Sequence, residues 1–153
     1  MLQGHCSCGA VHYQMQRAPM FVHCCHCRWC QRETGSAFAL NAMIETDAVQ
    51  VIKGAPGAVD VPTESGRGQR MFQCPDCATV LWSQYLGLGT EISLVRVGSL
   101  DDPDACPPDI HIFTESKQAW VSLGQGLPVR ERYYNRAKYW PADALARFHA
   151  VMG

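Results

Sequence analysis

The sequence has no long hydrophobic run and no excess of charge of either sign. No apolar stretch reaches the roughly 20 residues that cross a bilayer, and 13 Lys and Arg are balanced by 14 Asp and Glu. The opening residues MLQGHCSCGA lack the charged and then apolar order of a secretory signal. We therefore expect a cytoplasmic protein that does not enter membranes and that offers no positive field to nucleic acid.

Internal repeats, low-complexity tracts and a clear linker are also absent from the sequence. A chain of 153 residues, 47% of them hydrophobic, fits one domain that buries one core. We therefore predict a single domain over residues 1–153.

Short segments rich in β-branched and aromatic residues, separated by turn residues, predict a mostly β protein with antiparallel strands. The expected strands cover 11–15, 20–24, 38–45, 49–53, 69–73, 79–85 and 92–100. The Gly- and Pro-rich stretch 54–68 is expected to form turns, and 101–113, with its three prolines, an ordered loop that runs into an edge strand. A short C-terminal helix should start at Pro141, and another short helix should follow Cys30.

Nine cysteines, by contrast, are many for this length, and their number is odd. In a reducing compartment, closely spaced cysteines are more often metal ligands than disulfides. Apart from Cys106 they form three groups: Cys6 and Cys8; Cys24, Cys25, Cys27 and Cys30; Cys74 and Cys77.

The spacing within HCCHCRWC, residues 23–30, indicates which side chains share a side. On an extended strand, residues i and i+2 point the same way, and a C-x-x-C turn brings its two sulphurs together. Cys25, Cys27 and Cys30 should therefore form a three-sulphur cup, while Cys24 and His26 project the other way into packing. Rotation of His26 into the cup as a fourth ligand remains an alternative.

These pairs can be combined into two zinc sites. A tetrahedral zinc holds sulphurs about 3.8 Å apart, within reach of C-x-C and C-x-x-C units. Cys6, Cys8, Cys74 and Cys77 can complete one site, which would be structural. The cup of Cys25, Cys27 and Cys30 supplies three ligands and leaves a fourth position for water or substrate, as expected of a catalytic zinc. We predict two Zn²⁺ per chain.

The other candidate residues are assigned to packing. Cys24 is expected to be a small buried hydrophobe and Cys106 an unpaired loop thiol. Trp82 and Trp120 are interpreted first as core aromatics and second as pocket walls. The remaining histidines are expected to be surface or packed side chains: His5, His12, His23, His111 and His149.

Several segments resemble one known family, the glutathione-dependent formaldehyde-activating enzymes with their centromere-protein-V relatives. The matching stretches are GHCSCGAVHY, CHCRWCQRETGSAF, FQCPDCATVLW and, more loosely, VGSLDDPDACPPDIHIF with SKQAW. The resemblance implies an Mss4-like fold of coiled antiparallel β-sheets with two zinc sites, in which the four-cysteine set is structural and the three-cysteine set catalytic. One departure is Ala78, where glycine is common after C-P-x-C, because Ala tolerates positive φ poorly.

The resemblance also implies an activity, that of a carbon–sulphur lyase joining glutathione to formaldehyde to give S-hydroxymethylglutathione. The expected partners are therefore a small-molecule thiol and an aldehyde. An open three-thiolate zinc suits a soft sulphur ligand, and a thiol that loses its proton there could attack an aldehyde held close by. Arg28 or, preferably, Arg32 is expected to offset the negative charge. Thr34, Gly35 and Ser36 could contact a peptide-like substrate or simply form a polar turn.

Three alternatives remain open. The chain could be a non-catalytic zinc-stabilised module that docks a protein partner, which a fourth ligand such as His26 would favour. It could be a zinc enzyme of the same fold acting on another thiol or carbonyl compound. A nucleic-acid-binding zinc domain is disfavoured, because seven thiolates on two zinc ions add negative charge to an already acidic chain.

Overall fold

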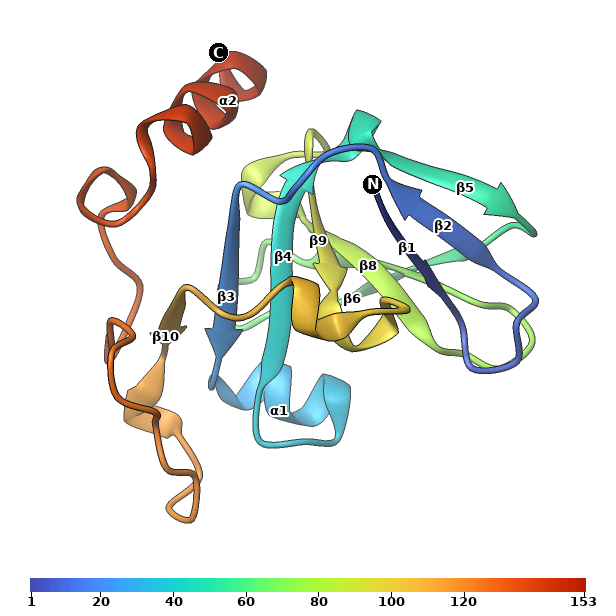
Figure 1. Ribbon diagram of the computed structural model, residues 1–153. Coiled ribbons are helices and arrows are strands. Elements are labelled where there is room, and N and C mark those ends of the chain that lie inside the picture. Colours follow the sequence, from blue (N-terminus) through green and yellow to red (C-terminus); the bar gives the residue numbers. More distant parts are fainter.

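The computed structural model describes residues 1–153 and places them in two β-sheets with two short helices (Figure 1). The smaller sheet has the strand order β1-β2-β5 and the larger one the order β10-β3-β4-β9-β8-β7-β6. The strands are β1 (Leu2–His5), β2 (His12–Met15), β3 (Phe21–Cys25), β4 (Ala39–Glu45), β5 (Val49–Lys53), β6 (Gly57–Val61), β7 (Gln69–Gln73), β8 (Val80–Tyr85), β9 (Ile92–Arg96) and β10 (Ile110–Ile112). The helices are α1 (Arg28–Thr34) and α2 (Ala142–Met152).

Neighbouring strands are antiparallel throughout, except that β10 runs parallel to β3 at the edge of the larger sheet. The predicted fold class, a mostly β protein with antiparallel strands and a short C-terminal helix, is therefore confirmed. The edge strand expected at the end of the stretch 101–113 is β10. The helix expected to follow Cys30 is α1, which begins earlier, at Arg28.

Two strands lie where the sequence predicted none. β6 falls within the stretch 54–68, whose glycines and prolines predicted turns, and it is exposed along almost its whole length, so no buried face marks it as a strand. β1 has only four residues, one of which is Gly4, and is too short and too polar to be recognised from composition. The strand expected over 92–100 ends at Arg96, because residues 97–99 form a 3₁₀ turn.

Gly4 allows β1 to lie against the loop that follows β9. A Cβ at this position would be 2.5 Å from the carbonyl oxygen of Ser99 and 2.6 Å from the ring of Tyr13. Gly4 pairs with Tyr13 across the smaller sheet and forms an isolated bridge to Leu100. Only glycine fits this approach, which places the following Cys6 beside the larger sheet.

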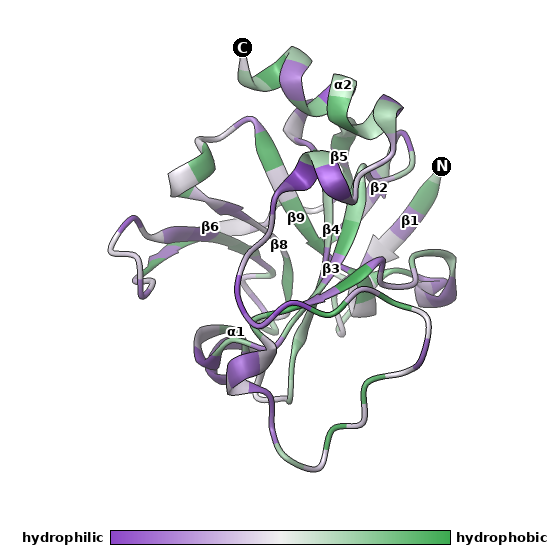
Figure 2. Ribbon diagram, turned by 90° about the vertical axis from the view of Figure 1, so that its left-hand side faces the viewer, coloured by the Kyte–Doolittle hydropathy of each residue, from purple (hydrophilic) through white to green (hydrophobic).

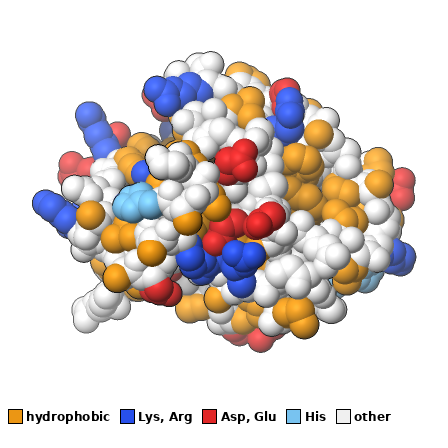
Figure 3. All heavy atoms as spheres, turned by 90° about the horizontal axis from the view of Figure 1, so that it is seen from above, with side chains coloured by type: hydrophobic (Ala, Val, Ile, Leu, Met, Phe, Trp, Pro, Cys, Tyr) orange, Lys and Arg blue, Asp and Glu red, His pale blue; other side chains and the backbone are white.

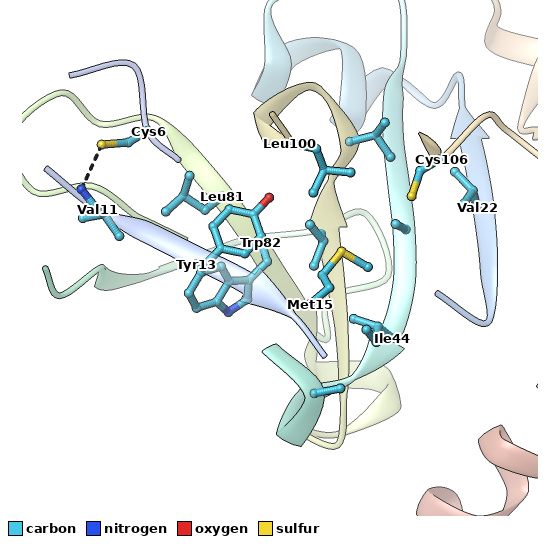
Figure 4. Packing of buried hydrophobic residues seen from close by; sticks show 14 of the residues in the cluster. Cys6, Val11, Tyr13, Met15, Val22, Ile44, Leu81, Trp82, Leu100 and Cys106 are labelled. Atoms are coloured by element: carbon cyan, nitrogen blue, oxygen red, sulfur yellow. Dashed lines mark hydrogen bonds between the residues drawn. The ribbon is translucent and has the colours of Figure 1, made fainter. Parts of the chain in front are cut away.

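The main core lies between the two sheets (Figure 4). Tyr13 of β2 meets Trp82 of β8 edge to face, with ring centroids 5.5 Å apart. Trp82 is thus the core aromatic that the sequence predicted. Cys6, whose sulphur accepts a hydrogen bond from the backbone N–H of Val11, lies at one end of this cluster and Cys106 at the other. Cys106 is an unpaired loop thiol, as expected, and it is buried.

A second cluster joins α2 to the larger sheet. Trp140 stacks on Phe21 of β3 at 5.2 Å and meets Phe148 of α2 edge to face at 5.5 Å. Arg147 of α2 also binds the buried Glu45 at the end of β4, at 2.7 and 2.9 Å. In both ribbon views α1 and α2 lie at opposite ends of the larger sheet (Figures 1 and 2), so α2 stabilises the fold far from α1.

Neither helix has the length and the apolar composition needed to span a bilayer. On the face seen from above, acidic and basic side chains are interspersed (Figure 3). That face therefore presents no field of a single sign.

Candidate metal centres

The four-cysteine group joins two turns that are distant in sequence. Cys6 and Cys8 follow β1, whereas Cys74 and Cys77 form the turn between β7 and β8. The sulphur of Cys8 lies 3.6 Å from that of Cys6 and 3.7 Å from that of Cys74, and all four sulphurs lie within 4.8 Å of one another. Tetrahedral zinc requires about 3.8 Å between sulphurs, so this donor set fits zinc without rearrangement.

Tight backbone turns hold these four sulphurs in place. The N–H of Gly9 donates to the carbonyl of Cys6 at 3.0 Å, and the N–H of Ala78 donates to the carbonyl of Cys74 at 2.9 Å. Ala78 has φ of 58°, which confirms that the second turn uses the left-handed conformation that the sequence placed in doubt. The left-handed region is unfavourable for an L-residue with a side chain, so this turn is strained.

Thr79 prepares one sulphur of this group for ionisation. Its hydroxyl lies 3.1 Å from the sulphur of Cys77. Hydrogen bonds from the side chain and the backbone of Thr79 lower the pKa of Cys77 to about 5. A thiolate is the form that binds metal, so Cys77 is ready to coordinate at neutral pH.

The three-cysteine cup lies where β3 passes into α1. Cys25 ends β3, Cys27 caps the N-terminus of α1, and Cys30 lies in its first turn. The backbone N–H of Cys30 donates to the sulphur of Cys27 at 3.3 Å. The three sulphurs lie within 4.8 Å of one another, and no fourth His, Cys, Asp or Glu joins them. The structure thus brings together the three residues that the sequence grouped.

Ionisation within the cup favours one thiolate. Hydrogen bonds from the thiols of Cys25 and Cys30, together with the backbone N–H groups of Cys30 and Trp29, lower the pKa of Cys27. The same sulphur contacts raise the pKa of Cys25 well above its ordinary value. A cation is therefore needed before all three sulphurs can ionise together, which is the behaviour expected of a metal-binding set.

The positive charge near the cup comes from Arg96 of β9, a residue that no spacing in the sequence indicated. The pKa of Cys30 is raised to about 12: the hydrogen bond with Cys25 lowers it, the hydrogen bond with Cys27 and burial raise it, and the charge of Arg96 makes the smallest contribution, which lowers it. Arg96 is buried and pairs with Glu33 of α1. Arg32, the residue preferred from the sequence, is exposed, and neither an ion pair nor a side-chain hydrogen bond forms at its guanidinium. The structure therefore favours Arg96 over Arg32 as the cation that acts on the cup.

His26 points away from the cup, as strand alternation predicts. Its Nε2 lies 3.0 Å from Nδ1 of His111 and 3.5 Å from the sulphur of Cys24. His26, His111 and Cys24 are all buried, so the packing expected for Cys24 and His111 is confirmed. The alternative in which His26 completes the cup is not seen.

Gln31 of α1 connects the cup segment to the loop after β10. Its amide donates to the carbonyls of His26 and Ser116 at 2.7 and 2.9 Å, and its carbonyl oxygen accepts from Arg28 and Gln118. The side chain is buried within an otherwise polar helix. Spacing gave no signal for this role, because the segment that contains Ser116 and Gln118 is distant in sequence.

Trp120 is 75% exposed, so its assignment to the core is wrong. Its indole N–H donates to the side chain of Gln118 at 2.7 Å. It borders a shallow hollow of about 430 Å³, which Arg28, Arg32, Gly35 and Ser36 also line. Thr34 donates to the carbonyl of Cys30 at 2.7 Å, so its hydroxyl serves the end of α1.

Aromatic side chains border the cup on the side of the second cluster. Phe113 and Tyr134 pack against the group that contains Cys25. Tyr133 stacks on Tyr134 at 4.9 Å and lies 6.3 Å from Phe113. Phe113 has φ of 55°, a strained conformation for a residue of this size. Cys27 and Cys30 also pack against this cluster, so the cup and these aromatic side chains belong to one apolar region.

Comparisons with known proteins agree with this geometry. Residues 1–116 match the family described as glutathione-dependent formaldehyde-activating enzyme. A protein of Halomonas elongata, which carries that family name provisionally, is 28% identical over 160 residues, covering 100% of this chain and 97% of its own length.

A solved structure supports the fold. The crystal structure of a Rhodobacter sphaeroides protein is similar with a TM-score of 0.50 and 21% sequence identity, over 67% of this chain and 93% of that one. The family match covers most of the chain and includes the four-cysteine group and the three-cysteine cup. The chain therefore belongs to the glutathione-dependent formaldehyde-activating enzyme family.

Proposed function

We propose that the chain is a carbon–sulphur lyase that joins a thiol, namely glutathione, to formaldehyde or a related aldehyde at the cup of Cys25, Cys27 and Cys30. The observation that carries this proposal is the donor count: three thiols within 4.8 Å of one another and no fourth protein donor, in a chain of this family. A protein set with one position open is typical of catalytic zinc, whereas structural zinc takes four protein ligands.

In this proposal the chain holds two zinc ions, one in the four-cysteine group and one in the cup. Bound zinc at the cup would supply a position for the substrate's sulphur and lower the pKa of that thiol. The chain's own contribution is to hold three thiolates with one side left free. The backbone N–H of Cys30 supports this arrangement by donating to the sulphur of Cys27.

The surrounding residues set the charge and the polarity of the cup's environment. Arg96, which is paired with Glu33, places a buried guanidinium whose charge favours the thiolate of Cys30. Phe113 and Tyr133 supply an apolar wall on which a small aldehyde would be held close to that sulphur. No side chain of the protein has to act as the nucleophile, because the substrate thiol is the attacking group.

The reducing cytoplasm is the compartment we propose, because all nine cysteines are unpaired and closely spaced thiols persist in that environment. We further propose that residues 1–153 act as one domain whose partners are a small thiol and an aldehyde. The orientation of His26, toward His111 and away from the cup, does not favour the non-catalytic alternative.

Replacing Cys27 by Ser tests the proposal. We expect the zinc content to fall from two ions per chain to one, and the enzyme-dependent rate of addition of glutathione to formaldehyde to fall to the uncatalysed rate. Cys106→Ala is the matched control, since Cys106 is a buried thiol outside every metal-binding group, and it should keep both zinc ions and the activity. Unchanged zinc content and activity in Cys27→Ser would contradict the proposal.

A further inference from the structure

A third group of metal-binding side chains lies across β3 from the cup. The sulphur of Cys24 is 3.5 Å from Nε2 of His26, which is 3.0 Å from Nδ1 of His111 on β10. The three donor atoms lie within 4.8 Å of one another. Because side chains alternate along a strand, Cys24 and His26 face away from Cys25 and Cys27. The group is thus separate from the cup.

These three side chains are enclosed. Cys24, His26 and His111 are 2%, 0% and 9% exposed. Nδ1 of His26 is buried and has no hydrogen-bond partner. The His26 ring is therefore oriented by packing against Phe38 and by what its Nε2 binds.

We propose that Cys24, His26 and His111 bind one Cu(I) ion. The ion forms bonds to the sulphur of Cys24, Nε2 of His26 and Nδ1 of His111, and the proton of the Cys24 thiol passes to solvent, with no change in oxidation state. Metal–nitrogen bonds of about 2.0 Å and metal–sulphur bonds of about 2.3 Å place donors about 3.3–3.8 Å apart. The observed 3.0 and 3.5 Å require shifts of a few tenths of an ångström.

Donor number and charge select Cu(I) over zinc. No fourth His, Cys, Asp or Glu reaches the group. Its three side chains are buried, unlike Cys27 and Cys30 of the cup, so solvent does not complete the four ligands that zinc prefers. A thiolate is a soft ligand that favours Cu(I). One Cu(I), one thiolate and two neutral imidazoles sum to zero charge, whereas a divalent ion would leave a buried net positive charge, which is costly.

The ion has a route to this enclosed group at the edge of the larger sheet. β10 carries His111, is three residues long and is the terminal strand of its sheet (Figure 1). Beyond β3, its pairing is an isolated bridge between His111 and Val129. On its outer side the backbone N–H of His111 donates to the carbonyl of Pro128, and its carbonyl accepts from the N–H of Arg130. Local opening of this short terminal strand would therefore be needed for an ion to reach the group.

The test is a titration of the zinc-loaded full chain with Cu(I), without oxygen, against a colorimetric Cu(I) chelator. We expect the wild type to take up one Cu(I) per chain and to keep both zinc ions. Cys24→Ala and His111→Asn should lose that uptake, while Cys106→Ala, which removes a buried thiol that has no imidazole neighbour, should retain it. X-ray absorption of the bound copper should report one sulphur and two nitrogens.

Equal copper uptake by the wild type and by folded Cys24→Ala or His111→Asn would overturn the proposal. Release of one zinc for each copper bound would also overturn it, because the ion would then occupy a cysteine site. Zinc content and circular dichroism identify the folded variants, and His111→Asn, on the edge strand, serves if Cys24→Ala does not fold. The proposal is independent of the thiol–aldehyde activity, since copper uptake is measured without either substrate.

Discussion

Arg96 of β9 pairs with Glu33 of α1, and the same guanidinium donates to the side-chain oxygen of Asn41 on β4. Arg96 is 10% and Glu33 20% exposed at the side chain. This contact joins the helix that carries Cys30 to two central strands of the larger sheet. The guanidinium therefore both neutralises charge near the cup and fixes the position of α1.

Replacing Arg96 by Gln should destabilise the protein by about 3 kcal/mol, because it leaves the carboxylate of Glu33 partly buried without a partner. In the Arg96→Gln variant, zinc should also leave the cup faster than it leaves the four-cysteine group. The measurements are urea denaturation and the rate of zinc transfer to a coloured chelator. Arg32→Gln, at an exposed side chain without an ion pair, should change stability by no more than about 0.5 kcal/mol. Faster zinc release from Arg32→Gln than from Arg96→Gln would restore the assignment made from the sequence.

Loss of Cys74 should affect folding more than loss of Cys27. Cys74 is fully buried and belongs to the group that joins two distant turns, and structural zinc binding contributes folding free energy. We expect Cys74→Ser to lower the melting temperature well below that of Cys27→Ser, as measured by circular dichroism. Addition of a chelator should then lower the melting temperature of the wild type toward that of Cys74→Ser. Equal melting temperatures of the two variants would argue against a structural role for the four-cysteine group.

Replacing Ala78 by Gly should stabilise the turn between β7 and β8. Ala78 has φ of 58°, a conformation that costs an L-residue about 1–2 kcal/mol and glycine almost nothing. Part of this gain is offset by the larger entropy of glycine in the unfolded chain, so we expect a net gain of about 0.5–1 kcal/mol by urea denaturation. The converse control is Gly66→Ala, at φ of 73° with no atom near its Cβ position, which should lose stability.

Docking of α2 should weaken in acid because of Glu45. Hydrogen bonds from Arg147 lower the pKa of the Glu45 carboxyl below its ordinary value. A lowered folded-state pKa means that the stabilisation is complete above the unfolded-state pKa and is lost as pH falls through the folded-state pKa. The contribution, about 1.5–3 kcal/mol for a hydrogen-bonded charge, should therefore begin to fall below the ordinary Glu pKa of about 4.3 and be lost as the pH falls through the lowered folded-state pKa.

Trp140 reports this transition, because it is buried against Phe21 and Phe148. Its fluorescence should change on acidification of the wild type. In Glu45→Gln, stability at pH 7 should be lower and that acid-dependent step should be reduced. Glu64→Gln, at an exposed carboxylate without an ion pair, should behave like the wild type. If the acid transition were unchanged in Glu45→Gln, carboxylates other than Glu45 would be responsible for it.

Local composition predicted most of the strands, since each expected segment is rich in β-branched and aromatic residues and overlaps a strand of the sheets. It failed where a strand is short, exposed or interrupted by glycine, as in β6 and β1. In β1 the glycine is required because Ser99 and Tyr13 lie close to it. Ser99 is distant in sequence, so this contact cannot be predicted from the local residue pattern.

By itself, the sequence determined which neighbouring cysteines bring their sulphurs close together. The C-x-C and C-x-x-C spacings depend on strand alternation and tight turns, which are properties of a few consecutive residues. Only the tertiary structure decided that Arg96 is the cation near the cup, that Trp120 is exposed, and that His111 meets Cys24 and His26. Those relationships depend on which strands pair and in what register, and pairing between distant segments is set by burial of the whole core rather than by spacing along the chain.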